Sequence, residues 1–201
     1  MPGSSFHIAL VGNPNSGKTS VFNSLTGLNQ KVGNFPGVTV DKKTGFCQLD
    51  TDVAATIIDL PGTYSLYPRR ADEWVAYKVL MGTDEDVAPD VVLLVADASN
   101  LKRNLLFCSQ IIDLKCPMVV ALTMMDIAKK KGVEIDVAGL ERELGVPVIP
   151  VNPRKNKGIA QLKKALAQTA KHNYMPSQWD FIPNRDLAAN AINGVKQLYP
   201  K

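Results

Sequence analysis

The chain lacks several features that would place it outside ordinary globular proteins. Its longest apolar runs, 91–96 and 118–122, are several-fold shorter than the roughly 20 residues of a membrane-spanning helix. The first residues carry no basic segment followed by an apolar one, so no secretory signal is indicated. Hydrophobic residues at 45% and charged residues at 21% argue against a disordered chain. We therefore expect a folded, cytosolic domain that does not cross a bilayer by itself.

Cysteine and histidine are also scarce. The three cysteines, Cys47, Cys108 and Cys116, form no C-x-x-C pair, which argues against a disulfide framework or a zinc site and favours buried thiols. The two histidines, His7 and His172, stand alone. The net charge of +4 is small and the basic residues are scattered, without the dense stripe and interleaved aromatics of a nucleic-acid face. We therefore expect no nucleic-acid partner.

Apolar strand-like runs alternate with helix-like segments along the chain, a pattern typical of a mostly parallel sheet covered by helices on both faces. Buried strands are predicted at 6–11, 55–59, 91–97, 118–123 and 146–151, with a more exposed strand at 38–48. Helices are predicted at 18–26, 72–82, 100–114, 136–144 and 159–171. The prediction is an α/β domain over residues 1–171, with about six strands and five helices.

The alternation of strand-like and helix-like segments ends in the last segment, residues 172–201. Pro176 and Pro183 bracket an aromatic stretch, and residues 184–198 have the pattern of a further helix. We expect this segment to begin a small helical domain that is cut short at Lys201.

A phosphate-binding loop is the strongest motif. The residues GNPNSGKT, Gly12 to Thr19, satisfy G-x-x-x-x-G-K-[ST] and lie between a predicted strand and a predicted helix, as the mechanism requires. Backbone N–H groups of such a loop surround phosphates, and the lysine, here Lys18, reaches the β and γ phosphates. The hydroxyl of Thr19 is a candidate Mg²⁺ ligand. The loop predicts a nucleoside triphosphate as ligand.

Two further positions suit a triphosphatase. Asp59 ends a buried strand in the string DLPG and would hold Mg²⁺ through water, while the N–H of Gly62 would face the γ-phosphate. A strand-ending Asp before Pro-Gly is also ordinary turn chemistry. Thr39 lies about twenty residues past the P-loop lysine and would complete the Mg²⁺ shell with GTP bound, although a β-branched strand residue is an equal alternative.

The base site is predicted where a later buried strand ends. Thr123, Met124, Met125 and Asp126 partly match the GTPase pattern [NT]-K-x-D, whose aspartate pairs with N1 and N2 of guanine. Met124 would lie along the purine face, and Asp126 could instead be a helix N-cap. The S-A-[KL]-type motif appears here as Asn152, Pro153 and Arg154, and Pro153 has no N–H to give to guanine O6. We therefore expect a GTP preference with relaxed specificity and some ATP hydrolysis.

Read together, the strings NPNSGKTS, VGNFPGVTV and DLPGTYSL resemble the FeoB family over roughly residues 5 to 171. The resemblance implies a Ras-like G domain of a bacterial inner-membrane protein, with 35–39 and 62–70 as its switches. It also implies an attached helical domain and permease and a role in ferrous iron uptake. Small Feo accessory proteins and further copies of the chain, in an oligomer, are the candidate partners. Asn15 matches the asparagine that ligates K⁺ in FeoB-like GTPases, beneath carbonyls of residues 33–35, or it only shapes the loop.

Thr63 stands where Ras-like enzymes carry the glutamine that orients water, so slow turnover is expected. Two alternatives stay open: a ribosome-assembly or tRNA-modifying K⁺-dependent GTPase, and a GTP-sensing module with little turnover. The candidate catalytic residues are Lys18, Asn15, Thr39 and Gly62, with GTP or GDP, Mg²⁺ and K⁺ as ligands. The candidate nucleotide-binding residues are Gly12, Asn13, Pro14, Asn15, Ser16, Gly17, Lys18, Thr19, Ser20, Asp59, Gly62, Thr123, Met124, Asp126, Asn152, Pro153 and Arg154.

Overall fold

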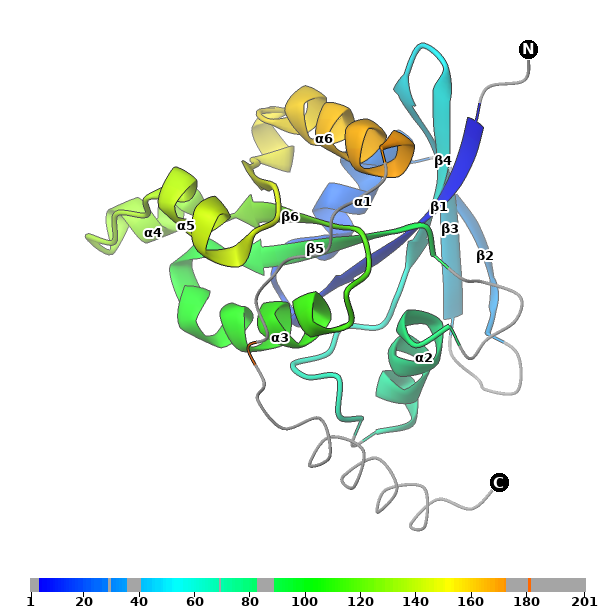
Figure 1. The fold of residues 1–201 in the computed structure, drawn as a ribbon, viewed down its shortest axis with the longest axis horizontal. Coiled ribbons are helices and arrows are strands. Elements are labelled where there is room, and N and C mark those ends of the chain that lie inside the picture. The colour runs from blue at the N-terminus through cyan, green and yellow to red at the C-terminus, as the bar shows by residue number, and fades with distance from the viewer. Residues whose placement is uncertain are drawn as a thin grey trace.

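A single seven-stranded sheet organises the chain (Figure 1). The computed structural model describes residues 4–28, 30–35, 41–68, 70–82, 89–172 and Phe181. The strands follow the order β2-β3-β4-β1-β5-β6-β7 across the sheet. Their bounds are β1 (Ser4–Gly12), β2 (Gln30–Asn34), β3 (Asp41–Asp50), β4 (Val53–Asp59), β5 (Val91–Asp97), β6 (Met118–Thr123) and β7 (Val148–Pro150).

The five strands from β4 to β7 in that order run parallel, whereas β3 pairs antiparallel with both β2 and β4. β1 lies between β4 and β5, so the chain leaves β1 toward one side of the sheet and later continues on the other. In open α/β sheets such a switch point places a crevice at the carboxyl ends of the strands. The sheet order therefore locates the expected site at the end of β1.

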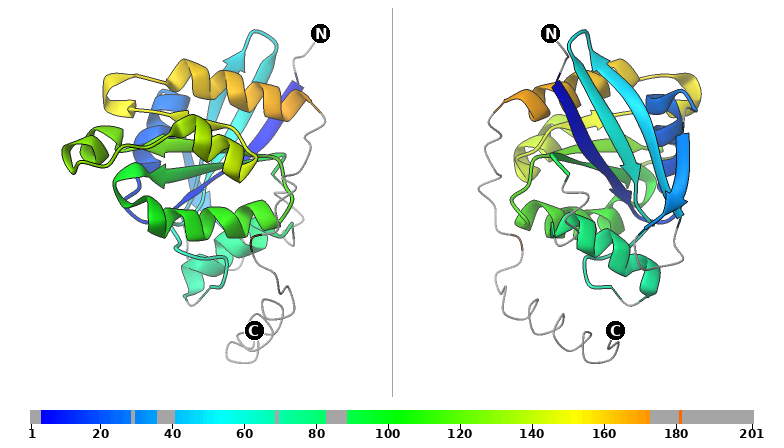
Figure 2. Two further views of the ribbon diagram at one scale, coloured as in Figure 1. Left: turned by 60° about the vertical axis from the view of Figure 1, so that its left-hand side comes forward. Right: turned by 90° about the vertical axis from the view of Figure 1, so that its right-hand side faces the viewer.

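Six α-helices and two short 3₁₀ turns accompany the strands among the described residues. They are α1 (Lys18–Thr26), α2 (Ala71–Leu80), α3 (Leu101–Asp113), α4 (Met125–Lys130), α5 (Val137–Leu144), α6 (Ile159–Lys171), η1 (Ala98–Asn100) and η2 (Pro153–Lys155), of which η2 and α6 follow the last strand. Side chains of α1 and α6 pack on one face of the sheet, and side chains of α2, α3 and α5 pack on the other (Figure 2). The predicted helices on both faces are confirmed.

The central strands show why the sequence folds this way. Six of the seven residues of β5 and all six of β6 are buried, as expected for parallel strands covered on both faces. The burial of β3 alternates instead, because one of its faces meets solvent. Continuous apolar runs therefore predict the centre of the sheet, and the mixed composition of β3 predicts its place near an edge.

The expected count of six strands and five helices is too low. The additional strand is β2, an exposed edge strand, and the additional helix is α4, a short helix directly after β6. The last strand is also shorter than the predicted 146–151. None of the helices in the described part of the chain is long and apolar enough to span a bilayer.

The expected helical segment mostly lies outside the described residues. Residues 173–180 and 182–201 are not described, so the helix predicted at 184–198 stays a prediction, as does the boundary after residue 171. α6 itself ends at Lys171, as predicted. Phe181 is described, and its backbone N–H donates to a carboxylate oxygen of Asp113 at the end of α3, 2.9 Å away.

Candidate nucleotide site

The phosphate loop follows β1 without a break and leads into α1. Gly12 fits against β5 so closely that a Cβ would approach the carbonyl oxygen of Val95 to 2.6 Å. Asn15 and Gly17 have positive φ values of 66° and 88°, which turn the loop back on itself. Lys18 is the first residue of α1. The motif therefore has the strand, turn and helix that its phosphate-binding mechanism requires.

Lys18 and Asp59 meet across the end of the sheet. The ammonium group of Lys18 forms a salt bridge with the carboxylate of Asp59, and the side chains are only 13% and 10% exposed. Lys18 comes from the start of α1 and Asp59 from the last position of β4. Two residues predicted from separate motifs thus form an ion pair, in which the positive charge of Lys18 and the negative charge of Asp59 largely neutralise each other.

The segment after Asp59 packs directly on the phosphate loop. The N–H of Thr63 donates to the carbonyl oxygen of Gly12 over 3.2 Å. A Cβ added to Gly62 would lie 3.3 Å from the backbone nitrogen of Pro14, so a side chain there would crowd the loop. Gly62 is therefore placed beside the phosphate loop, as its predicted contact with a γ-phosphate requires.

Buried polar groups without partners gather in the same loop. Asn13 and Ser16 are 4% and 2% exposed, and neither the Asn13 amide nor the Ser16 hydroxyl hydrogen-bonds with a described residue. Unpaired buried polar groups are costly and are uncommon away from functional sites. Their position supports the phosphate loop as the functional centre.

The expected potassium site is only partly described. Asn15 is an exposed residue of the phosphate loop. Gly33 and Asn34 were expected in a loop closing over it, but they belong to β2 and pair with Lys42 and Asp41 of β3. Phe35 is buried, with the Lys42 ammonium 5.6 Å from its ring centroid. Thr39, with the rest of 36–40, lies outside the described residues.

The base motif begins at a residue that also holds the phosphate loop. Thr123 is 2% exposed, and its hydroxyl lies 2.7 Å from the carbonyl oxygen of Ser16 and 3.1 Å from that of Ala96. Met124 follows with a φ of 56°, in the left-handed region, and occupies the N-cap position of α4. Its methyl carbon would lie 3.6 Å from a Cβ added to Gly17. Met124 therefore folds over the phosphate loop.

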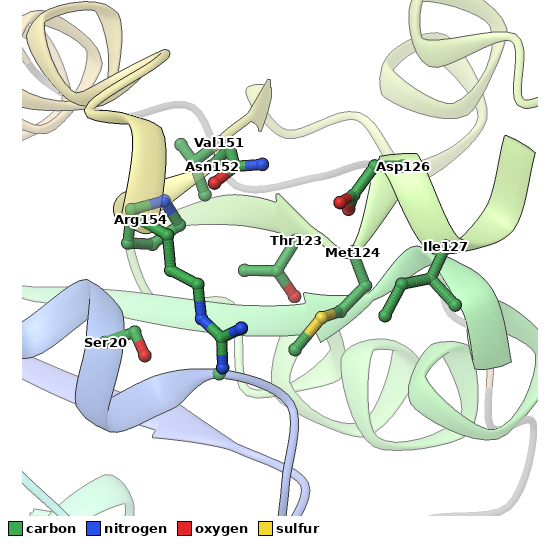
Figure 3. A pocket seen from close by; sticks show the side chains of 10 residues that line it. Ser20, Thr123, Met124, Asp126, Ile127, Val151, Asn152 and Arg154 are labelled. Carbon is green, nitrogen blue, oxygen red and sulfur yellow. The ribbon is translucent and has the colours of Figure 1, made fainter.

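A pocket opens between α1, α4 and η2 (Figure 3). It brings together the predicted base residues with two that were not predicted, Ile127 and Val151. Asp126 lies in the first turn of α4 and makes no cap hydrogen bond, so the alternative of a helix N-cap is wrong. The lining residues are Gly17, Ser20, Thr123, Met124, Asp126, Ile127, Val151, Asn152, Pro153 and Arg154.

The segment after β7 forms one wall of this pocket. Asn152 is the N-cap of η2, and its side-chain oxygen accepts from the N–H of Lys155 over 3.2 Å. Asn152 also exchanges two backbone hydrogen bonds with Lys157, of 2.9 and 3.1 Å. Pro153 opens η2 and presents no N–H to the pocket. The structure therefore places these residues beside the base motif.

The remaining candidate groups lie away from this site. Cys47 and Cys108 are buried and Cys116 is half-buried, and all three are free thiols, as predicted. Burial raises the pKa of the Cys108 thiol to about 12 and that of Cys116 to about 11. Within the described residues, no group of three or more His, Cys, Asp and Glu side chains could hold a metal ion.

The sheet order, the loop at its switch point and the adjoining pocket define a P-loop domain of the α/β class. Residues 6–166 match the family model for ferrous iron transport protein B. The Fe(2+) transporter FeoB of Leptospira biflexa is 45% identical over 173 residues, which cover 86% of this chain and 24% of the relative. The Salmonella typhimurium transporter is 47% identical over 163 residues, which cover 79% of this chain and 20% of that relative. The chain belongs to the FeoB family, and it spans about a quarter or less of these relatives.

Solved structures agree with this assignment. The G domain of the T. maritima FeoB iron transporter superimposes with a TM-score of 0.76 and 39% identity, covering 84% of this chain and 100% of that one. A mutant of S. thermophilus NFeoB bound to mGDP superimposes with a TM-score of 0.80 and 41% identity. The match covers 92% of this chain and 69% of that one. The chain thus corresponds to the N-terminal G domain of the family.

Proposed function

We propose that this domain binds GTP with Mg²⁺ and hydrolyses it slowly. The observation that carries the proposal is the meeting of Lys18 and Asp59 at the phosphate loop, with Asp126 in a pocket on the other side of Gly17. A triphosphate would take the Lys18 ammonium as its cationic partner, which releases the carboxylate of Asp59. The S. thermophilus relative bound to mGDP supports a guanine nucleotide as the ligand.

The residues present fit a magnesium ion beside the phosphates. Thr19 is exposed at the start of α1, and hydroxyl and carboxylate oxygens are ligands that Mg²⁺ accepts. Thr19 would bind the ion directly and Asp59 would hold it through water, while Thr39, which the structure does not describe, would complete the shell. When bound, Mg²⁺ neutralises charge that develops on the β and γ phosphates.

Slow turnover follows from the side chain after Gly62. Thr63 is 2% exposed, and its hydroxyl donates to the carbonyl oxygen of Ser65 over 2.7 Å. A hydroxyl engaged in this way orients no attacking water, so Gly62 N–H and Lys18 would act mainly by stabilising charge. K⁺ held by Asn15 would add a further positive charge beside the β and γ phosphates. Turnover would therefore be stimulated by K⁺.

The wider role follows from the family and extends beyond this chain. Because the relatives are Fe(2+) transporters several times longer than this chain, we propose that it regulates or drives ferrous iron uptake through an attached membrane permease. The domain would then lie on the cytoplasmic side of a bacterial inner membrane, joined to the permease through a helical domain that begins near residue 172. Small Feo proteins and an oligomer are candidate further partners.

ATP is a second candidate substrate, favoured by Pro153. Proline has no N–H, so the wall of the pocket at Pro153 lacks one backbone hydrogen-bond donor to the base. Losing one such hydrogen bond costs roughly 1 to 3 kcal/mol of binding free energy, or about one to two powers of ten in selectivity for GTP over ATP. Asp126 would still favour guanine through N1 and N2. We therefore propose a GTP-preferring enzyme that also binds ATP and hydrolyses it slowly.

A turnover assay separates the proposal from its rivals. Phosphate release from GTP with Mg²⁺ and K⁺ supports an enzyme, whereas tight GTP binding without release would favour a GTP-sensing module. A ribosome-assembly or tRNA-modifying GTPase is disfavoured because residues 6–166 match the ferrous iron transport family. Full-length protein reconstituted in vesicles would test iron uptake, and uptake that is indifferent to nucleotide would contradict that part of the proposal.

A further inference from the structure

The described part of the second expected switch, residues 62–68, runs between the phosphate loop and α3. The backbone N–H of Thr63 donates to the carbonyl oxygen of Gly12 over 3.2 Å. Further along, the N–H groups of Ser65 and Tyr67 donate to the hydroxyls of Thr63 and Ser65, over 3.3 and 3.1 Å. Such hydroxyl-capped turns give the segment a defined local shape. Its position relative to the phosphate loop then depends on what holds its other side.

Arg103 of α3 holds Tyr64 in this segment. The guanidinium carbon of Arg103 lies 3.8 Å from the centroid of the Tyr64 ring. A guanidinium at this distance is attracted to the face of the ring and can stack on it. Tyr64 is 37% exposed, and Arg103 forms none of the ion pairs found among the described residues. The ring is therefore the partner of this surface cation.

Gln110 of α3 holds Leu66, two residues further along the segment. The N–H of Leu66 donates to the side-chain oxygen of Gln110 over 2.8 Å, and Gln110 is only 5% exposed. Arg103 and Gln110 lie about two turns apart and therefore on the same side of α3. Phe107, which lies between them in the helix, is fully buried in the core, so α3 is a rigid support. The helix thus fixes the segment at Tyr64 and at Leu66.

Gly62 has no side chain with which to fix its own backbone. A residue without a Cβ can adopt many conformations, so the direction of its N–H depends on its neighbours. It lies against the phosphate loop, where an added Cβ would be 3.3 Å from the backbone nitrogen of Pro14. The Thr63 hydrogen bond and the Tyr64 ring follow it directly in the chain. The contacts with α3 are therefore close enough to Gly62 to orient its N–H.

We propose that Arg103 and Gln110 are positioning residues for GTP hydrolysis, which act through Tyr64 and Leu66 to aim the N–H of Gly62 at the γ-phosphate. The inference rests on the proposed function. A donor that is already oriented stabilises developing charge without the cost of reorganising first. Because GDP has no γ-phosphate, these contacts should affect the turnover of GTP and leave the affinity for GDP unchanged.

The first test is a double-variant cycle on the Tyr64 and Arg103 pair, with kcat and KM measured for GTP and Kd for GDP. Arg103→Ala should lower kcat by about 2- to 5-fold, the factor that corresponds to an exposed cation–π contact, with KM and the Kd of GDP little changed. The double variant should be no slower than Tyr64→Ala alone, because the contact is already lost. Tyr64→Phe keeps the ring and should behave as the wild type. Lys102→Ala, which removes the neighbouring exposed cation of α3, should do the same.

The second test concerns Gln110 and uses a measurement besides activity. Gln110→Met removes the acceptor at similar size and should lower kcat by about 5- to 150-fold, since the buried N–H of Leu66 loses its partner. Amide hydrogen exchange followed by mass spectrometry should be faster over residues 62–68 in Gln110→Met and in Arg103→Ala. Exchange in β5, at the centre of the sheet, should stay as slow as in the wild type.

Four outcomes would overturn the inference. A weaker affinity for GDP in Arg103→Ala, by the same factor as the loss in kcat, would show general support of the phosphate loop. Faster GTP turnover in Arg103→Ala would show that α3 restrains the segment in an unproductive position. Additive losses in the double variant, or unchanged exchange over residues 62–68, would show that the ring contact does not hold the segment. A wild type that releases no phosphate from GTP would instead overturn the proposed function.

Discussion

The hydroxyl of Thr123 lies 2.7 Å from the carbonyl oxygen of Ser16, so the last residue of β6 is tied to the phosphate loop. The same hydroxyl lies 3.1 Å from the carbonyl oxygen of Ala96 in β5. One buried side chain therefore connects the base motif, the loop that would hold the phosphates and the centre of the sheet. Positions 107 residues apart in sequence are held at one point of the site.

Replacing Thr123 with Val should destabilise the domain by about 1 to 3 kcal/mol and weaken nucleotide binding. The methyl group replaces the hydroxyl at nearly the same volume, so the loss comes from the buried hydrogen bond that the single hydroxyl proton donates to the carbonyl oxygen of Ser16 or Ala96. Thermal and urea unfolding would measure the change. Thr123→Ser keeps the hydroxyl and should lose less stability than Thr123→Val. A serine variant as unstable as the valine variant would argue against the hydrogen bond.

Much of the fold could be predicted because its central strands have strong local signals. β5 and β6 are short, continuous apolar runs, and both were predicted at their observed bounds. β2 could not be predicted, because all five of its residues are exposed and only pairing with β3 makes it a strand. α4 has six residues and starts after a left-handed Met124, too few for a periodic pattern.

The site could be predicted where a motif carries its own geometry. Lys18 and Asp59 belong to such motifs, and the structure brings them together. Their direct salt bridge could not be predicted, since it depends on how β1 and β4 pair. Ile127 and Val151 were missed as pocket residues because an apolar side chain next to a motif gives no signal of its own.

Turnover should rise when Na⁺ is replaced by K⁺ at constant ionic strength. Asn15 is an exposed residue of the phosphate loop, and amide and carbonyl oxygens suit the larger ion. Asn15→Ala should remove the response, as measured by phosphate release in the two salts. Stimulation that persists in the variant would mean that the ion binds elsewhere or acts by screening.

ATP should be a weaker second substrate of the wild type. Exchanging Asn152 for Ser and Pro153 for Ala together would restore a backbone N–H beside the pocket and should increase the preference for GTP by about one to two powers of ten. GTP and ATP turnover would be measured in parallel. A wild type that already excludes ATP as completely as the double variant would refute the relaxed specificity.

The three thiols should resist alkylation in the folded domain. Burial raises the pKa of Cys108 to about 12 and of Cys116 to about 11, from the usual 9.0, and it raises the pKa of Cys47 against the opposing effect of the Lys163 ammonium. Their neutral forms stabilise the fold fully below pH 9, and this contribution falls as the pH rises toward the folded values. A thiol reagent at pH 8 should label none of them quickly and all three after unfolding. Fast labelling of native protein would contradict their burial.

Asp59→Ala should weaken Mg²⁺-dependent GTP binding and lower the stability of the nucleotide-free domain. Lys18 and Asp59 are almost fully buried, and removing one partner of such a pair costs about 3 kcal/mol because the other charge is left unpaired. Binding with and without Mg²⁺ and thermal unfolding would measure both effects. The double variant with Lys18→Ala should recover part of the stability, and a double variant less stable than either single one would contradict the pairing.

Phosphate release from GTP by the wild type and by Lys18→Ala, with Mg²⁺ and K⁺ present, tests the account most directly. Lys18 is the only side-chain cation within the phosphate loop, so we expect slow release by the wild type and none above background in the variant. Lys171→Ala, at the end of α6, should behave as the wild type. Wild-type release surviving in a folded Lys18→Ala protein, or no release by the wild type itself, would contradict the assignment of a GTP-hydrolysing site to this loop.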